Sequence, residues 1–202
     1  MNVYADIYGY ELWPFFAGAL VVLLVVFRLR KMSLPRLLFC AIFGVYLIYA
    51  AEILFFPLHI SGGLADAQRS QPFLRDIYLN PFDFGPFGSF SAALPTLALN
   101  ILLTVPFGFG IRFVVPVRTR QIRWIAPAVG LAAEGTQLAV SLLIGYVYRQ
   151  IDIKDFLMNA LGVVIGYTLF LAFARFYVSM SRRLRIPRAG LTAYVHDVAT
   201  RT

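Results

Sequence analysis

The sequence has few of the residues on which disulfide-bonded and metal-binding proteins depend. Its 202 residues include one cysteine, Cys40, and two histidines, His59 and His196. A single cysteine can form no disulfide within the chain and no cysteine-based metal site. The two histidines lie too far apart in the chain for joint zinc binding with the usual ligands. We therefore expect no metal and no cofactor.

Charge is also scarce. Only 14% of the residues are charged, 60% are hydrophobic, and the mean hydropathy is +0.75. A soluble domain carries about 25% charged residues, so this composition excludes a disordered chain and argues against a soluble enzyme. The sequence also lacks a Walker-type phosphate loop and a Gly-x-Ser-x-Gly nucleophile elbow. Its positive residues lie between long apolar runs, and we expect no nucleic-acid partner.

What the sequence does have is apolar runs of membrane-spanning length. A spanning helix needs roughly 20 apolar residues to cross a hydrocarbon core about 30 Å thick. Five segments approach or reach this length, at about residues 13–27, 37–56, 91–111, 124–146 and 155–177. No Lys or Arg precedes the first segment, so we expect no cleavable signal peptide. The sequence predicts an all-α, polytopic membrane helical bundle of about five transmembrane helices.

The positive residues predict how this bundle is oriented. Most of the 18 Lys and Arg residues fall between the first and second spans, between the third and fourth, or after the fifth. Cytoplasmic loops are enriched in Lys and Arg, so we expect the N-terminus outside and the C-terminus in the cytoplasm. The basic tail at 181–202 is explained by this topology signal, and an arm that binds acidic lipid is the alternative.

Polar residues recur at helical spacing in the fourth and fifth spans. Both sets follow steps of 4, 3 and 4 residues, namely Gly130, Glu134, Gln137 and Ser141, then Asp155, Asn159, Gly162 and Gly166. Residues at this spacing share one face of a helix, and the Gly162–Gly166 pair permits close approach of another helix. The helical rise puts Gln137 roughly 13 Å and Glu134 roughly 18 Å below the outer boundary. We expect a polar cleft that opens outward and is closed toward the cytoplasm.

The candidate binding residues are the polar groups that such a cleft would collect: Asn100, Glu134, Gln137, Arg149, Asp152, Asp155 and Asn159. An acid near the bilayer midplane is costly and usually functional, so Glu134 is the main candidate, with Arg149 as its natural counter-ion. Glu134 and Asp155 are candidate general bases, and Glu52 is a further possible carboxylate. Simpler roles remain open: Asp152 as a helix N-cap, and the three amides as bonds between helices.

The connection at residues 57–90 is long and contains four phenylalanines between 82 and 90. A loop of this length is functional or mobile. The aromatic residues predict either a segment that covers the cleft or an interfacial aromatic belt.

Three parts of residues 78–172 have a recognisable pattern. They are the stretch Leu79-Asn80-Pro81-Phe82, the set Asn100, Pro106 and Gly108, and the series Glu134, Gln137, Arg149, Asp152, Asp155, Asn159, Gly162 and Gly166. This pattern resembles the VanZ-like family of bacterial membrane proteins. The resemblance implies a location in the bacterial cytoplasmic membrane and an association with low-level resistance to teicoplanin-type glycopeptides. Some members are labelled acyltransferase-like.

Relative to that family, the first span is an addition to a four-helix core. We therefore divide the chain into an additional N-terminal transmembrane helix at 1–35, a VanZ-like membrane core at 36–180, and a basic cytoplasmic tail at 181–202. The Glu134-Gly-Thr-Gln137 segment is less apolar than the family pattern implies.

Three hypotheses about function follow. The first is a cell-envelope protein that recognises a membrane lipid or a lipid-linked cell-wall precursor. Arg149 would then pair with a phosphate or carboxylate, while Asp152 and Asp155 orient it or hold a cation. The second is an intramembrane enzyme that uses Glu134 or Asp155 as general base. The third is a structural partner for another membrane protein.

Overall fold

The computed structural model describes residues 6–201 and is almost entirely helical. Within this part of the chain, five helices are long and apolar enough to cross a membrane: α1 (Gly9–Leu29), α2 (Leu34–Phe55), α4 (Phe90–Val114), α5 (Ile122–Ile144) and α6 (Ile153–Arg183). Each overlaps one of the five predicted spans. The prediction of an all-α membrane bundle is confirmed.

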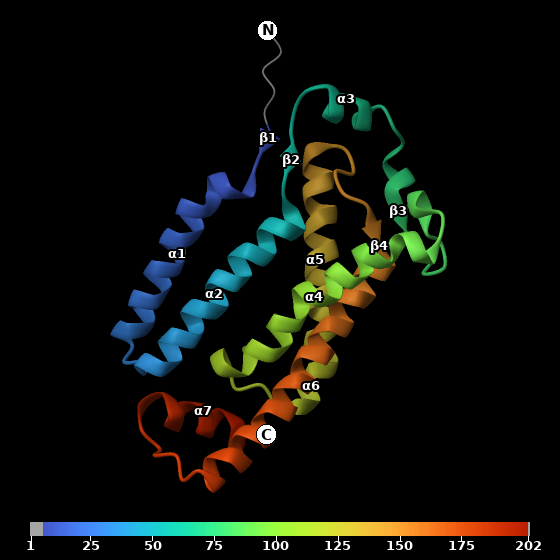
Figure 1. The fold of residues 1–202 in the computed structure, drawn as a ribbon. Coiled ribbons are helices and arrows are strands. Elements are labelled where there is room, and N and C mark those ends of the chain that lie inside the picture. The colour runs from blue at the N-terminus through green and yellow to red at the C-terminus, as the bar shows by residue number, and fades with distance from the viewer. Residues whose placement is uncertain (1–5, 202) are drawn as a thin grey trace.

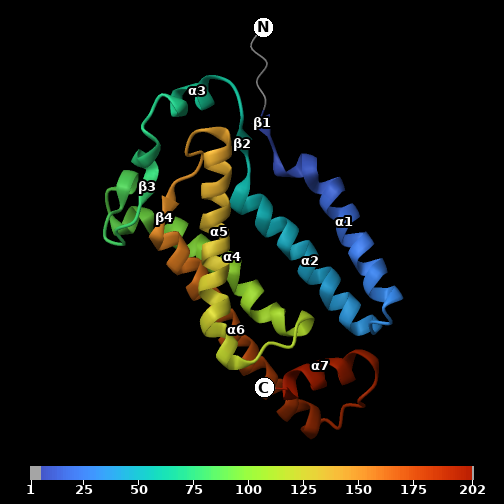
Figure 2. The same ribbon diagram turned by 180° about the vertical axis from the view of Figure 1, so that it is seen from behind.

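Three of these helices form the centre of the molecule. Helix α4 crosses α6, and α5 packs along α6, while α1 and α2 form a pair beside them (Figures 1 and 2). Helix α1 contacts mainly α2, and its most apolar stretch has no buried residue. The start of α1 and the end of α6 lie at opposite ends of the bundle, as an odd number of spans requires (Figure 1).

Glycines set the close approach of the central helices. A Cβ atom added at Gly166 of α6 would collide with the carbonyl of Val105 in α4, and one at Gly108 would collide with the carbonyl of Val163. Next to these contacts, the Thr104 hydroxyl donates a hydrogen bond to the carbonyl of Asn159 (2.8 Å). The expectation that a small-residue surface on α6 permits close helix packing is therefore confirmed.

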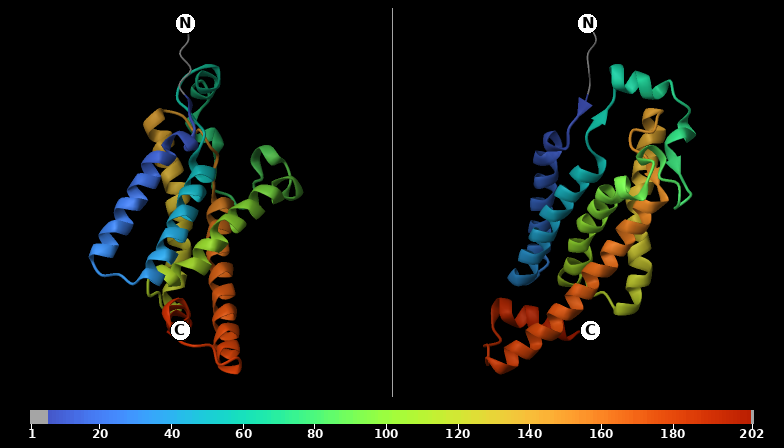
Figure 3. Two further views of the ribbon diagram at one scale, coloured as in Figure 1. Left: turned by 60° about the vertical axis from the view of Figure 1, so that its left-hand side comes forward. Right: turned by 45° about the vertical axis from the view of Figure 1, so that its right-hand side comes forward.

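Two strand pairs and a short helix, α3 (Gly63–Arg69), lie at the N-terminal end of the bundle. Strand β1 (Asp6–Ile7) pairs with β2 (Leu58–His59), and β3 (Ile77–Tyr78) pairs in parallel with β4 (Ile151–Asp152). The β3–β4 pair attaches the long 57–90 connection to the segment between α5 and α6. The right-hand view of Figure 3 shows this strand pair beside the start of α6. This connection is thus fixed against the end of the bundle.

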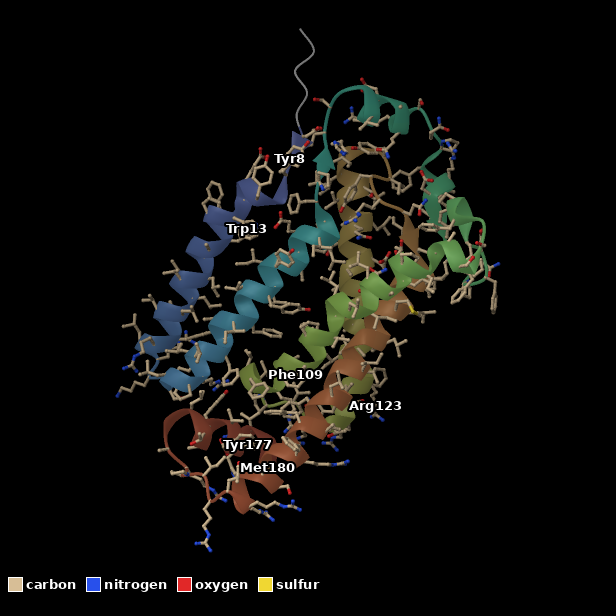
Figure 4. All side chains as sticks on the ribbon, in the orientation of Figure 1. Tyr8, Trp13, Phe109, Arg123, Tyr177 and Met180 are labelled. Atoms are coloured by element: carbon tan, nitrogen blue, oxygen red, sulfur yellow. The ribbon has the colours of Figure 1, made fainter. Side chains whose placement is uncertain are left out.

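The opposite end is closed by α7 (Gly190–Thr200), in the segment that we expected to be a basic tail. Val198 and Ala199 of this helix are buried. The Tyr194 hydroxyl donates to the carbonyl of Phe113 in α4, and the Tyr177 hydroxyl of α6 donates to that of Thr192. Figure 4 labels Tyr177 and Met180 on the part of α6 beside α7. The tail is therefore a docked helix, and its cytoplasmic location stays a prediction from charge.

Candidate functional site

A polar cavity of about 300 Å³ lies between the C-terminal end of α2, the middle of α4 and α5, and the start of α6. Its lining residues are Ile53, Leu54, Thr96, Leu99, Asn100, Leu103, Glu134, Gln137, Tyr148, Arg149, Gln150 and Asp155. Five of the seven predicted binding residues are in this set, and Asp152 and Asn159 are not. Arg149 is exposed and so lies at the opening of the cavity.

The end of α2 forms one wall of the cavity, and two site residues bond to it. Pro57 has no N–H, so it cannot pair with the carbonyl of Ile53 as the next turn of a helix would. One guanidinium nitrogen of Arg149 donates instead to the carbonyls of Ile53 and Leu54, at 2.6 Å each. The Gln137 amide also donates to the carbonyl of Leu54 (2.9 Å). A cation is favourable here because the C-terminal end of a helix carries partial negative charge.

Glu134 lines the cavity from α5, one turn before Gln137, and is 8% exposed. Its carboxylate accepts a hydrogen bond from the backbone N–H of Asp152 (3.2 Å). The charges of Asp155 and Asp152 repel it and that of Arg149 attracts it. Among the described residues, however, Glu134 and Arg149 form no ion pair within 4.0 Å. The predicted counter-ion therefore acts at longer range, because its guanidinium bonds to α2.

Two hydrogen-bond donors in the cavity wall are left without an acceptor. The buried amide nitrogen of Asn100 makes no hydrogen bond within 3.5 Å in residues 6–201, and its side chain interacts only at longer range with the Asp155 carboxylate. The Tyr148 hydroxyl is likewise buried and unpartnered in that range. A buried donor without an acceptor costs about 1–3 kcal/mol. A bound molecule that supplies acceptors here would recover this free energy.

Tyr148 was not found from the sequence, although it contributes a hydroxyl to the cavity. Burial raises the pKa of its phenol; the nearby Arg149 lowers that pKa and Glu134 raises it again. The hydroxyl is therefore protonated at neutral pH and available as a donor. The only signal in the sequence was its position immediately before Arg149.

Asp152 has a structural role. It is the N-cap of α6, accepting from the backbone N–H of Lys154 (2.8 Å), and it forms an ion pair with the Lys154 ammonium (2.8 Å). Both side chains are buried, at 9% and 7% exposed. Lys154 also donates to the carbonyl of Asp83 and lies 5.5 Å from the centre of the Phe84 ring. No motif in the sequence singles out Lys154, although it fastens the 57–90 connection to α6.

Asn159 is fully buried one turn below Asp155, away from the residues that line the cavity. Both polar atoms of its side chain lack a partner in the part of the chain that the structure describes. Its backbone carbonyl accepts the Thr104 bond described above. Asn159 thus belongs to the α4–α6 interface.

Glu52 also lies outside the cavity. Its carboxylate accepts a hydrogen bond from the Trp13 indole of α1 (2.7 Å), and its side chain packs against Gly9. Figure 4 labels Trp13 between the two helices. Glu52 therefore joins α1 to α2.

The cavity thus combines two carboxylates, one guanidinium, two unpartnered donors and several amide groups. No group of three or more His, Cys, Asp or Glu side chains within residues 6–201 is arranged to hold a metal ion. The chemistry available is hydrogen bonding, charge pairing at the opening, and proton transfer by a carboxyl group.

Five apolar helices with a polar cavity between them define a multi-pass membrane protein. A family model described as VanZ/LLP1 matches residues 43–175, about two thirds of the chain. The chain belongs to the VanZ/LLP1 family. The matched region contains every residue that lines the cavity and leaves out α1 and α7. No curated protein and no solved structure matches the chain.

Proposed function

We propose that this VanZ/LLP1 protein binds the head group of a lipid-linked envelope molecule in the polar cavity. The observation that carries the proposal is the convergence of the unpartnered Asn100 and Tyr148 donors with Glu134, Asp155 and Arg149 on one cavity. Its volume of about 300 Å³ is at the lower end for small-molecule sites. That size suits one head group and leaves a lipid tail in the bilayer.

The charges of the cavity limit which head groups fit. When both carboxyls are ionised, Glu134 and Asp155 outweigh the single charge of Arg149, and a bare phosphate would meet net repulsion. A fitting molecule carries hydroxyl or amide donors for the two acids. It also carries an acceptor or anionic group for Arg149, Tyr148 and Asn100. Glycosyl phosphates and peptide-bearing cell-wall precursors have both kinds of group.

The location and the drug association are part of the same proposal. Family membership supports a bacterial protein of the cytoplasmic membrane, and the inside-positive rule favours an outward opening of the cavity. A molecule bound there is accessible from the outer leaflet, where teicoplanin-type glycopeptides act on cell-wall precursors. Occupancy of the cavity would thereby change susceptibility to these drugs.

Binding to the purified protein tests this proposal. The full chain in detergent is mixed with a polyprenyl-linked cell-wall precursor, and the complex is quantified by native mass spectrometry. Glu134→Gln and Arg149→Ala should each weaken binding on the order of tenfold or more, because hydrogen bonds to charged groups contribute about 1.5–3 kcal/mol. Glu52→Gln is the matched control, since it makes the same change in a carboxylate outside the cavity. Equal binding by all four proteins would contradict the proposal.

Cells expressing the same variants provide the second readout. The wild-type protein and Glu52→Gln should shift teicoplanin susceptibility alike, and Glu134→Gln should not. If the shift in susceptibility persists in both Glu134→Gln and Arg149→Ala, resistance does not depend on the cavity.

The second candidate function is that of an intramembrane enzyme. It is favoured by the two carboxyl groups, of Glu134 and Asp155, that line the same cavity as the Arg149 guanidinium. Glu134 and Asp155 line the same cavity, so one carboxyl can accept a proton from a bound molecule while the other donates one. Purified protein incubated with a radiolabelled polyprenyl phosphate precursor should then form product, and Glu134→Gln should abolish it. A flat time course for the wild type leaves binding as the function.

A further inference from the structure

A second concave surface lies at the opposite end of the molecule, between the last three turns of α6 and the C-terminal end of α7. This groove encloses about 790 Å³. It is lined by Leu171, Ala174, Arg175, Val178, Ser179, Arg182, Arg183, Ala199 and Thr200. In Figure 4, nitrogen-bearing side chains project from this end of α6. The groove is far from the polar cavity and independent of it.

Three arginines give the groove its charge. Arg175, Arg182 and Arg183 are exposed, and no carboxylate of residues 6–201 pairs with any of them. The nearest acid in the sequence, Asp197 of α7, is already paired with Arg201. The groove therefore holds three positive charges that the described protein does not neutralise.

The positions of the three arginines along α6 show that they do not all serve to stabilise the C-terminal end of the helix. Arg182 and Arg183 lie in the last turn, where cations stabilise the negative end of a helix. Arg175 lies about two turns earlier, on the face that it shares with Ser179 and Arg182 at steps of four and three residues. Stabilisation of the helix end does not explain an arginine at position 175, whereas an anion bound by all three arginines does.

The other walls of the groove are apolar. Leu171, Ala174 and Val178 lie toward the membrane-spanning part of α6, and Ala199 of α7 faces them across the groove. A ligand that fits has a charged end for the arginines and an apolar end for this strip. Polybasic sites at a membrane surface attract anionic lipids by roughly 1 kcal/mol per Lys or Arg.

We propose that the groove between α6 and α7 binds the phosphate head group of an anionic phospholipid. The three guanidiniums hold the phosphate, the Ser179 hydroxyl donates to one of its oxygens, and the acyl chains lie along Leu171 and Val178. The lipid comes from the leaflet at this end of the bundle and joins α7 to α6 from the side. Free phosphate compounds share the head-group chemistry, and the experiment distinguishes them.

Photocrosslinking tests this assignment. The full chain is reconstituted in phosphatidylcholine vesicles that contain a minor fraction of photoreactive phosphatidylglycerol, and labelled peptides are mapped by mass spectrometry. The wild type should be labelled within 171–183 and near 199–200. The triple variant Arg175→Gln, Arg182→Gln and Arg183→Gln should lose this labelling on the order of tenfold or more.

A second triple variant controls for overall charge. Arg118→Gln, Arg120→Gln and Arg123→Gln removes three exposed arginines in the α4–α5 connection and the first turn of α5, outside the groove. It should keep groove labelling within about twofold, since none of its three arginines lines the groove. Equal loss in both triple variants, or no loss in either, would overturn the proposal.

Two further labelling experiments distinguish an anionic lipid from a soluble phosphate compound as the ligand of the groove. Photoreactive phosphatidylcholine in place of the anionic lipid should label the groove weakly. An excess of glycerol 3-phosphate should leave the wild-type labelling unchanged, and displacement by this soluble compound would overturn the lipid assignment. If the groove triple variant does not fold, Arg175→Gln alone replaces it, with a loss of about threefold or more, and unchanged labelling again counts against the proposal.

Discussion

The carboxylate of Glu134, in the middle of α5, accepts a hydrogen bond from the backbone N–H of Asp152, the residue that caps α6 (3.2 Å). This bond fixes the distance between the α5 wall of the cavity and the start of α6. Asp155 follows Asp152 by three residues, so the same bond determines where the second carboxyl of the cavity lies. The cap of α6 is therefore a positioning element for the site.

Breaking the buried pair at this cap should destabilise the protein strongly. Lys154→Met leaves the Asp152 carboxylate buried and unpaired, and a loss of about 3–5 kcal/mol is expected. The double variant Lys154→Met and Asp152→Asn removes the uncompensated charge and should recover much of this loss. Thermal unfolding in one detergent measures all three proteins. A double variant less stable than Lys154→Met would contradict this interpretation.

The glycine contacts between α4 and α6 should tolerate no side chain. Gly166→Ala places a methyl group against the Val105 carbonyl, and overpacking of this kind costs about 1–3 kcal/mol. Gly135→Ala in α5 is the control, because a Cβ there meets nothing within 4 Å. It should leave the unfolding temperature unchanged or raise it, given the helix propensity of alanine. Equal effects of the two substitutions would argue against close helix packing at Gly166.

Tyr148→Phe should affect stability and binding in opposite directions. The substitution removes a buried hydroxyl that has no partner among the described residues, so the ligand-free protein should be as stable as the wild type or more stable. The same hydroxyl is a donor in the proposed site, so affinity for the polyprenyl-linked precursor should fall about fivefold or more. Unfolding curves and native mass spectrometry measure the two effects. A variant that loses stability and keeps full affinity would refute this role.

Alkaline pH provides a separate test of Tyr148. Burial raises the pKa of this phenol above its ordinary value, which is about 10 in an unfolded chain. The folded state thus binds the proton more tightly, and this contribution to stability is present below pH of about 10 and lost as the pH rises through the folded pKa. Tyr148→Phe should therefore lose less stability than the wild type between about pH 9 and pH 11. Parallel pH profiles of the unfolding temperature would show that Tyr148 does not titrate in this range.

The sequence was sufficient to predict the spans and five of the twelve residues that line the cavity. Apolar run length locates α1, α2, α4, α5 and α6, because each must be long enough to cross the bilayer. Helical spacing put Glu134 and Gln137 on one face of α5, and the structure agrees. The second span was predicted to end at about residue 56, and α2 ends at Phe55, two residues before Pro57.

The roles of four residues could not be predicted, because each role depends on contacts with segments that are distant in the sequence. Asn159 shares the spacing of Asp155, yet α4 crosses α6 at that level and covers it. Glu52 has no recognisable partner until α1 is placed against α2. Lys154 and Tyr148 lie outside the regular helical stripes, where the path of the connections decides which side chains meet.

Pro57 has a consequence for how the cavity communicates with the rest of the bundle. Because that proline leaves the last carbonyls of α2 bare, the guanidinium at the opening of the cavity is already engaged with them. The Trp13–Glu52 hydrogen bond in turn joins α2 to α1. The residue at the opening of the cavity is therefore connected through the end of α2 to α1, a helix outside the region that the family model matches.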